Sequence, residues 1–201
     1  MAAERTAVLL DWGGVMTGDL FGSFRAFCTA EGLDPDVLAN LFRHDREARA
    51  LLIDFECGRV EEADFEPRLS GALGLAWHQG LIDRLFAESA IDDAMVDGVR
   101  ALRSRGVRTG LVSNSWGTRR YPRELLAELF DGVVISGEEG FRKPDPRMYA
   151  LGASRIGVAP SECVFVDDLA FNLDPARDLG MAVVHHTGAE STLAELERLV
   201  G

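Results

Sequence analysis

The stretch Ala7–Met16, AVLLDWGGVM, decides the fold, because a short apolar run ends there at an acid followed by two glycines. The run Ala7–Leu10 has the pattern of a strand buried on both faces, as in a parallel sheet. Asp11 then falls at the carboxyl end of this strand, where open α/β sheets bind ligands. Gly13 and Gly14 allow the backbone to turn sharply and to approach whatever Asp11 contacts. Taken alone, the segment fits an ordinary strand and turn equally well.

The remainder of the fold prediction comes from the second half of the chain, where apolar runs alternate with helical periodicities from Asp93 onward. Four further strands are expected at 107–113, 132–136, 163–168 and 181–186, each separated from the next by a helix. Strands that alternate with helices are typical of a parallel sheet covered on both faces. We therefore predict an α/β fold with a Rossmann-like parallel sheet as its core.

The segment between Asp19 and Ser89 has no strand pattern and instead repeats apolar residues at helical spacing. Four helices are expected there, of which the second is opened by Asp34-Pro35 and continues through the polar run RHDREARALL. We expect an all-helical cap over residues 18–91, inserted into an α/β core formed by residues 1–17 and 92–201.

Composition limits the kinds of partner. The formal net charge is −12, with 33 acidic residues against 21 lysines and arginines, which argues against binding to nucleic acid or to an anionic membrane. The three cysteines lack metal-site spacing and are expected as buried thiols in a reducing compartment. The sequence has no apolar segment long enough for a signal peptide or a membrane span, so a cytoplasmic protein is expected.

Polar residues follow three of the expected strands, and a lysine lies in a loop near them. They are Asp11, Ser113-Asn114, Lys143 and Asp167-Asp168. The carboxyl ends of parallel strands share one edge of the sheet, so these groups can converge there. Singly, Ser113 is also a plausible helix cap and Lys143 a plausible solvated lysine. Two adjacent buried carboxylates, however, repel each other unless a cation or protons compensate, and Mg²⁺ suits such oxygen ligands.

In this order, the motifs resemble those of the haloacid dehalogenase superfamily of hydrolases along nearly the whole chain. The turn DWGGV with Asp11 is similar to the first motif, LVSN with Ser113 to the second, KPDP with Lys143 to the third, and FVDDLAFNL to the fourth. The expected helical segment corresponds to the helical cap of the family. The runs SNSWG, KPDP and DDLAFN most resemble the branch that contains the phosphatase domain of soluble epoxide hydrolases and bacterial sugar-phosphate phosphatases.

The resemblance implies a Mg²⁺-dependent phosphatase in which Asp11 attacks phosphorus and forms an aspartyl-phosphate. Ser113, Asn114 and Lys143 would hold the phosphoryl oxygens. Substrate contacts are expected from Trp12, Asn114, Ser115 and Trp116. The metal site would comprise Asp11, the Gly13 carbonyl, Asp167 and Asp168, with Asn172 behind them. The implied substrate is a small phosphorylated metabolite, either a sugar phosphate or another phosphate with a good leaving group.

Gly13 departs from the family pattern, which usually has a second aspartate there as general acid and base. Because such catalysis contributes about 10²–10⁴-fold, we expect slow turnover of alkyl phosphates and faster turnover of substrates with better leaving groups. An aspartate at position 13 is expected to restore the donor if it fits the turn, even with a positive φ.

Three alternatives stay open from the sequence. Phosphonoacetaldehyde hydrolase has a similar DWAGT-type motif but needs a cap lysine, whereas Lys143 is the only lysine here. Haloacid dehalogenases, which hydrolyse carbon–halogen bonds without a metal, typically lack the acidic pair Asp167-Asp168. A catalytically impaired protein that binds a phosphorylated ligand or a partner is the third. The sequence does not distinguish a monomer from a homodimer. Substrate contacts in the cleft are also conceivable from Arg43, His44, Arg46, Arg119 and Arg142.

Overall fold

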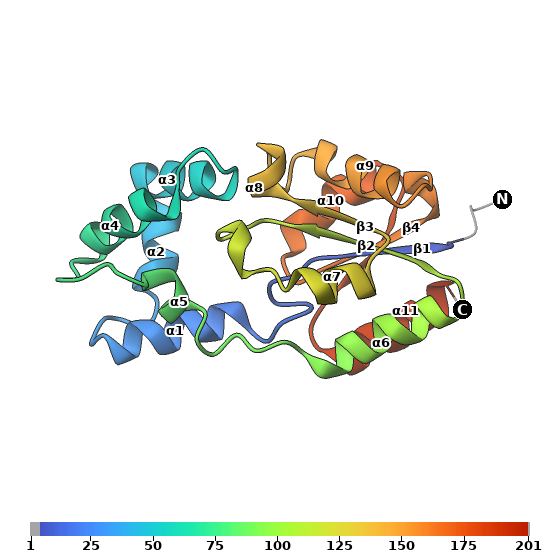
Figure 1. Ribbon diagram of the computed structural model, residues 1–201, viewed down its shortest axis with the longest axis horizontal. Coiled ribbons are helices and arrows are strands. Elements are labelled where there is room, and N and C mark those ends of the chain that lie inside the picture. Colours follow the sequence, from blue (N-terminus) through green and yellow to red (C-terminus); the bar gives the residue numbers. More distant parts are fainter. Residues whose placement is uncertain (1–4, 201) are drawn as a thin grey trace.

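The computed structural model describes residues 5–200 and contains a five-stranded, fully parallel sheet in the order β3-β2-β1-β4-β5 (Figure 1). The strands are β1 (Ala7–Leu10), β2 (Arg108–Ser113), β3 (Gly132–Ile135), β4 (Cys163–Asp167) and β5 (Ala182–His185). The predicted α/β fold with a parallel sheet is confirmed. The expected limits of the core at residues 1 and 201 lie outside the described residues.

β1 lies at the centre of the sheet and is fully buried, because its alternate residues pack into two separate apolar clusters, one on each face of the sheet. Val8 and Leu10 face a cluster covered by α6 (Asp93–Ser104), α7 (Arg123–Leu129) and α11 (Ala189–Val200). Ala7 and Leu9 face the opposite cluster, covered by α9 (Pro146–Arg155) and α10 (Ala170–Asp178) (Figure 1). A strand buried on both faces explains why AVLL is apolar throughout rather than alternating.

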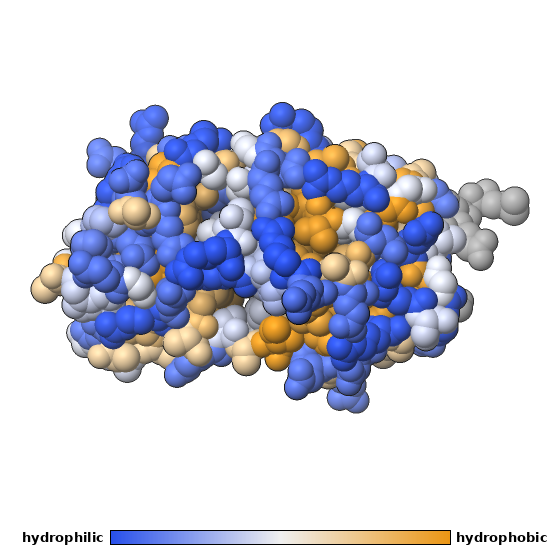
Figure 2. All heavy atoms as spheres, viewed as in Figure 1, coloured by the Kyte–Doolittle hydropathy of each residue, from blue (hydrophilic) through white to orange (hydrophobic). Residues whose placement is uncertain are grey.

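Between β1 and α6 the chain forms five helices that lie at one end of the sheet, on the left in Figure 1. They are α1 (Leu20–Ala30), α2 (Val37–His44), α3 (Arg46–Glu56), α4 (Glu62–Leu73) and α5 (Leu81–Leu85). Their apolar sides form a third cluster of their own. An antiparallel bridge between Thr17 and Ile91 brings the two ends of this segment together. In Figure 2 hydrophilic residues, in blue, cover much of the boundary between these helices and the sheet.

The long second helix expected from the sequence is two helices, because Asp45 separates them. Its backbone is extended, and its N–H still donates to the Leu41 carbonyl at the end of α2. The Asp45 carboxylate accepts a hydrogen bond of 2.8 Å from the Ala48 N–H and so caps the start of α3. The short helix α8 (Ser136–Glu139) after β3 was also not expected.

The structure bears on the cysteines and on the apolar character of the helices. Cys28, Cys57 and Cys163 are all buried and unpaired, as expected. Within residues 5–200, none of the helices combines the length and the apolar character required to cross a bilayer.

Candidate active site

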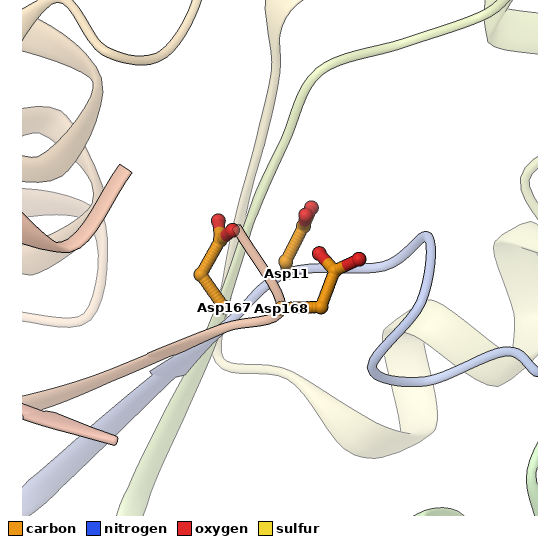
Figure 3. Close-up of side chains that lie close together, drawn as sticks. All are labelled: Asp11, Asp167 and Asp168. Atoms are coloured by element: carbon orange, nitrogen blue, oxygen red, sulfur yellow. The ribbon is translucent and has the colours of Figure 1, made fainter. Parts of the chain in front are cut away.

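Three carboxylates converge at the carboxyl ends of β1 and β4. The two strands are neighbours, with Leu10 paired to Val166, so the residues that follow them emerge at the same edge of the sheet. Ligand oxygens of Asp11, Asp167 and Asp168 all lie within 4.8 Å of one another. Figure 3 shows the three side chains projecting to the same side of the sheet edge. The convergence expected from the strand pattern is therefore present.

Lys143 is fully buried beside this cluster and makes ion pairs with two of its members. Its Nζ lies 2.8 Å from Asp11 Oδ1 and 2.7 Å from Asp167 Oδ2. Asn114 holds the backbone of the lysine on both sides. The Asn114 Oδ1 accepts from the Lys143 N–H at 2.8 Å, and its Nδ2 donates to the Lys143 carbonyl at 3.1 Å. The loop with Lys143 is thus tied to the end of β2.

The hydrogen bonds of the acids separate their roles. Asp167 accepts from Lys143, from the Leu169 N–H at 2.9 Å and from Asn172 Nδ2 at 3.0 Å, so both of its oxygens are engaged. Asp11 Oδ1 accepts from the Trp12 N–H at 2.7 Å and from Lys143, whereas Asp11 Oδ2 accepts from none of the described residues. The Asp168 carboxylate accepts from its own backbone N–H and from no other described residue. Free oxygens for a ligand are therefore those of Asp11 and Asp168.

The electrostatics of the cluster favour an added cation. The pKa of Asp11 is raised to about 7, chiefly by burial; the charge of Lys143 lowers it, and the charges of Asp167 and Asp168 raise it. Burial and Asp167 raise the pKa of Asp168 to about 6. Burial lowers the pKa of Lys143, but Asp11 and Asp167 outweigh this and raise it above its ordinary value. One ammonium does not balance three carboxylates, and this all-oxygen donor set fits Mg²⁺.

Of the two glycines after Asp11, only Gly14 has a backbone conformation that favours glycine. Gly14 has a φ of 77°, and a Cβ there would lie 2.5 Å from Asp168 Oδ2, so backbone and carboxylate approach closely. Gly13 has no positive φ, and a Cβ there would lie 3.3 Å from Leu20 Cδ2. An aspartate at position 13 would therefore not have to adopt a positive φ.

Ser113 ends β2 at the same edge, and its Oγ lies 2.8 Å from the Tyr121 hydroxyl. Both residues are buried, and burial raises the pKa of Tyr121 well above its usual range. The Trp12 ring packs against Tyr121, with 6.0 Å between centroids. Tyr121 was not anticipated, because a tyrosine in a loop beyond the second motif has no pattern that marks it.

A cavity of about 290 Å³ opens onto this cluster, and Asp11, Asn114, Lys143 and Asp168 form its polar end. Most of its other wall is apolar and comes from the helices α1 to α3 and two aromatic rings outside them: Leu20, Phe21, Phe24, Leu38, Phe42, Leu52, Trp116 and Phe171. A second cavity of about 350 Å³ is lined by Trp12, Ser113 and Tyr121. Gly13 and Trp116 line both, so the two spaces meet beside Asp11.

The tryptophan and serine candidates after Asn114 behave differently. Trp116 inserts from the loop after β2 into the aromatic cluster of the helices, with centroids 5.1 Å from Phe24 and 5.7 Å from Phe86. Ser115 lines neither cavity at the cluster; its N–H donates to Ser136 Oγ at 2.8 Å. The structure therefore brings Trp116 to the candidate site and directs Ser115 away from it.

Among the basic residues considered from the sequence, Arg43 and Arg142 line the cavity at the acidic cluster, whereas His44 and Arg46 do not. Arg119 pairs with Glu62 and Asp83 instead of facing that cavity. Glu56 was not singled out in the sequence, yet it is buried on the cavity wall beside Arg142. No motif identifies it, because an acid near the end of an amphipathic helix usually faces solvent.

The chain is similar to known hydrolases in sequence and in structure. The family model of haloacid dehalogenase-like hydrolases matches residues 6–180. The chain is 28% identical to rat bifunctional epoxide hydrolase 2 over 82% of its length, but spans only 36% of that protein. It is 32% identical to the sesquiterpene phosphatase astK of Aspergillus oryzae, over 73% of this chain and 78% of the relative. A hydrolase structure from Porphyromonas gingivalis, described as HAD-like, superposes with a TM-score of 0.70 at 25% identity, covering 98% and 99% of the two chains.

Proposed function

The chain belongs to the haloacid dehalogenase-like hydrolases, and from this membership we propose that it is a Mg²⁺-dependent phosphatase of a small phosphorylated metabolite. The observation that carries the proposal is the buried lysine between Asp11 and Asp167, next to the third carboxylate of the cluster, Asp168. This arrangement offers a carboxylate nucleophile, a fixed positive charge and oxygen ligands for a metal in one place. The relationship to a sesquiterpene phosphatase supports phosphate ester hydrolysis over carbon–halogen chemistry.

Asp11, the Gly13 carbonyl and Asp168 would hold Mg²⁺, which would supply positive charge against the repulsion between the anionic nucleophile and the phosphate. Asp167 and Asn172 support the site from behind, since Asp167 is already bonded to Lys143 and Asn172.

The remaining groups act on the phosphoryl group itself. Asp11 Oδ2 attacks phosphorus in line, and the leaving oxygen departs into the apolar part of the cavity. Lys143, the Ser113 hydroxyl and the Asn114 amide contact the phosphoryl oxygens and compensate their charge in the transition state. Trp12 and Trp116 form apolar walls beside the reacting group.

We further propose that the leaving group is a hydrocarbon rather than a sugar. The part of the wall formed by Leu38, Phe42 and Leu52 offers the hydroxyls of a sugar no hydrogen-bond partners, and unpaired buried polar groups are costly. Hydrocarbon burial instead stabilises the complex by roughly 25 cal/mol per Å². The sesquiterpene named for the Aspergillus relative is a hydrocarbon skeleton of this kind.

With Mg²⁺ present, a sesquiterpenoid monophosphate is expected to be hydrolysed with a higher kcat/KM than glucose 6-phosphate, and removal of metal with EDTA is expected to abolish both activities. Phe42→Ala should lower kcat/KM for the terpenoid about 10- to 100-fold, corresponding to the lost burial of one aromatic ring, with little change for the sugar. Released phosphate is the readout, and re-addition of Mg²⁺ is the control. Equal kcat/KM for the two substrates would contradict the apolar leaving group.

We also propose that residues 18–91 act as a cap that opens and closes over the sheet. The separate apolar cluster and the Thr17–Ile91 bridge support a unit whose two connections to the rest of the chain lie side by side. An ionic network joins the cap to the loop after β2 in the closed form. Arg120 lies 2.6 Å from Glu62 and 2.7 Å from Asp83, and Arg119 contacts the same two acids. Hydrogen bonds from Arg120 and Arg119 lower the pKa of Glu62 to about 2, so the network stays charged at neutral pH.

Hydrogen exchange measured by mass spectrometry tests the cap. Binding of Mg²⁺ with a phosphate analogue is expected to slow exchange in α1 to α3 and in the loop 114–121, because closure excludes water. Helix α11, which packs against α6 and β5, serves as the internal control. Unchanged exchange in the cap while the β1–α1 turn becomes protected would show ligand binding without closure.

The composition of the chain supports a further proposal on its partners and location. We propose a cytoplasmic protein whose partner is a small phosphorylated substrate and which binds neither nucleic acid nor membrane, in keeping with its net charge of −12.

A further inference from the structure

Cleavage of an alkyl phosphate needs a proton on the leaving oxygen, and Gly13 has no side chain to supply it. Four carboxylates line the cavity at the candidate site: Asp11, Asp36, Glu56 and Asp168. Asp11 is the proposed nucleophile, Asp168 is a proposed metal ligand, and Asp36 is exposed to solvent. Glu56 is the buried carboxylate on this wall that has no role so far.

Glu56 is the last residue of α3, and its side chain is only 7% exposed. Its Oε2 lies 2.7 Å from Arg142 Nε, but the geometry is not that of a hydrogen bond, and this buried oxygen has no hydrogen-bond partner within the described residues. Glu56 shares the cavity wall with Asp11 and Lys143. Resting on the phosphatase function proposed above, we infer that Glu56 is the general acid and base of this enzyme, taking the place of the aspartate missing at position 13.

Contacts with the sheet domain hold Glu56 in position. The Ser115 N–H donates to Ser136 Oγ, whose hydroxyl in turn donates to the Glu56 carbonyl. Two residues later, Gly58 packs directly on the backbone of α8: a Cβ there would lie 2.3 Å from the Gly137 carbonyl oxygen. The end of α3 is thus fastened to the sheet domain through a side chain and a backbone contact. Ser115 is then a positioning residue rather than a substrate ligand.

The protonation of Glu56 suits this role. Burial raises its pKa to about 7, outweighing Arg142, Lys143 and the Trp116 indole, which all lower it. These are the charged and polar groups that face the carboxyl from the neighbouring loops. A group that titrates near neutral pH can both give and take a proton at the pH of the reaction.

The proposed reaction has two steps. In the first, the Asp11 oxygen forms a bond to phosphorus, the bond from phosphorus to the leaving oxygen breaks, and the Glu56 proton moves to that oxygen to give the alcohol. In the second, the Glu56 carboxylate takes a proton from water as the water oxygen bonds to phosphorus. The bond between Asp11 and phosphorus then breaks, which releases inorganic phosphate and restores both side chains.

The test compares Glu56→Gln with the native enzyme on an alkyl phosphate and on p-nitrophenyl phosphate, in Mg²⁺. For the alkyl substrate kcat/KM is expected to fall about 10²–10⁴-fold, because the proton donor is lost. For the aryl substrate it is expected to change by no more than about twofold, since nitrophenolate leaves without a proton and kcat/KM reports the first irreversible step. Native kcat/KM for the alkyl phosphate should also decline above about pH 7 as Glu56 ionises, and Glu56→Gln should lack this decline.

Two further variants make the result specific. Glu66→Gln changes another buried glutamate of the cap, one that accepts from the Gly80 and Ile82 N–H groups outside the cavity, and should leave the ratio of the two kcat/KM values unchanged. Gly13→Asp in the Glu56→Gln background should restore part of the alkyl rate, since the φ at position 13 accepts a side chain.

An equal fall for both substrates, or no fall for either, would overturn the assignment of Glu56 while leaving the phosphatase proposal in place. Absence of phosphate release by the native enzyme from either substrate would instead defeat the phosphatase proposal itself.

Discussion

Asp11→Asn is expected to lower kcat by at least about 10³-fold on every phosphate ester, because the amide cannot form the covalent phospho-enzyme. The substitution preserves the size of the side chain and removes one negative charge from a crowded site. Burial already raises the pKa of Asp11 to about 7, so loss of that charge does not cost the fold stability. Activity should therefore fall without a fall in the unfolding midpoint.

Steady-state kinetics with p-nitrophenyl phosphate measure kcat, and the midpoint of thermal unfolding shows whether the fold is retained. Mass spectrometry of acid-quenched native enzyme should show one added phosphoryl group, which is absent from Asp11→Asn. Asp97→Asn, at an exposed position on α6 far from the cavity, is the matched control and should keep native activity. Turnover by Asp11→Asn close to the native rate would disprove covalent catalysis by this residue.

Lys143→Met is expected to lower the free energy of unfolding by about 3–5 kcal/mol and to abolish activity. The methionine keeps most of the apolar stem but leaves Asp11 and Asp167 as buried carboxylates without their counter-ion. For a chain of 201 residues, this corresponds to a decrease in Tm of roughly 6–20 °C. Since the pKa of Lys143 is raised in the fold, its contribution is fully present below its unfolded pKa and is lost only as pH rises through the folded value.

Urea unfolding at pH 7 therefore measures the whole effect of Lys143. The double variant with Asp167→Asn should be more stable than Lys143→Met alone, because it removes one uncompensated charge, and the cycle isolates the coupling between the two residues. Mg²⁺ should stabilise Lys143→Met as well, since it supplies positive charge to Asp11 and Asp168. A change in unfolding free energy below about 1 kcal/mol would mean that the lysine does not compensate these acids.

The strands and the acidic end of the sheet could be predicted because each depends on local pattern. Ala7–Leu10 is apolar at every position since both of its faces are covered, and this property is visible in four consecutive residues. Parallel pairing of β1 with β4 then places Asp11 beside Asp167 whatever the intervening chain does. Asp45, by contrast, divides the predicted second helix into two, and it does so through a single capping hydrogen bond. The helical spacing of apolar residues continues across this break, so the pattern does not reveal it.

The sequence by itself therefore determined the α/β fold, the carboxylates at the edge of the sheet and the residue types of the candidate site. Only the tertiary structure decided that Lys143 bridges Asp11 and Asp167, that Ser113 meets Tyr121, and that Glu56 enters the cavity while Ser115 turns away. Strand and helix patterns arise from periodic burial of near neighbours. Contacts such as those of Glu56 arise where the end of α3 docks on α8, which is far away in the chain, and their geometry depends on the packing of residues that are not adjacent in sequence.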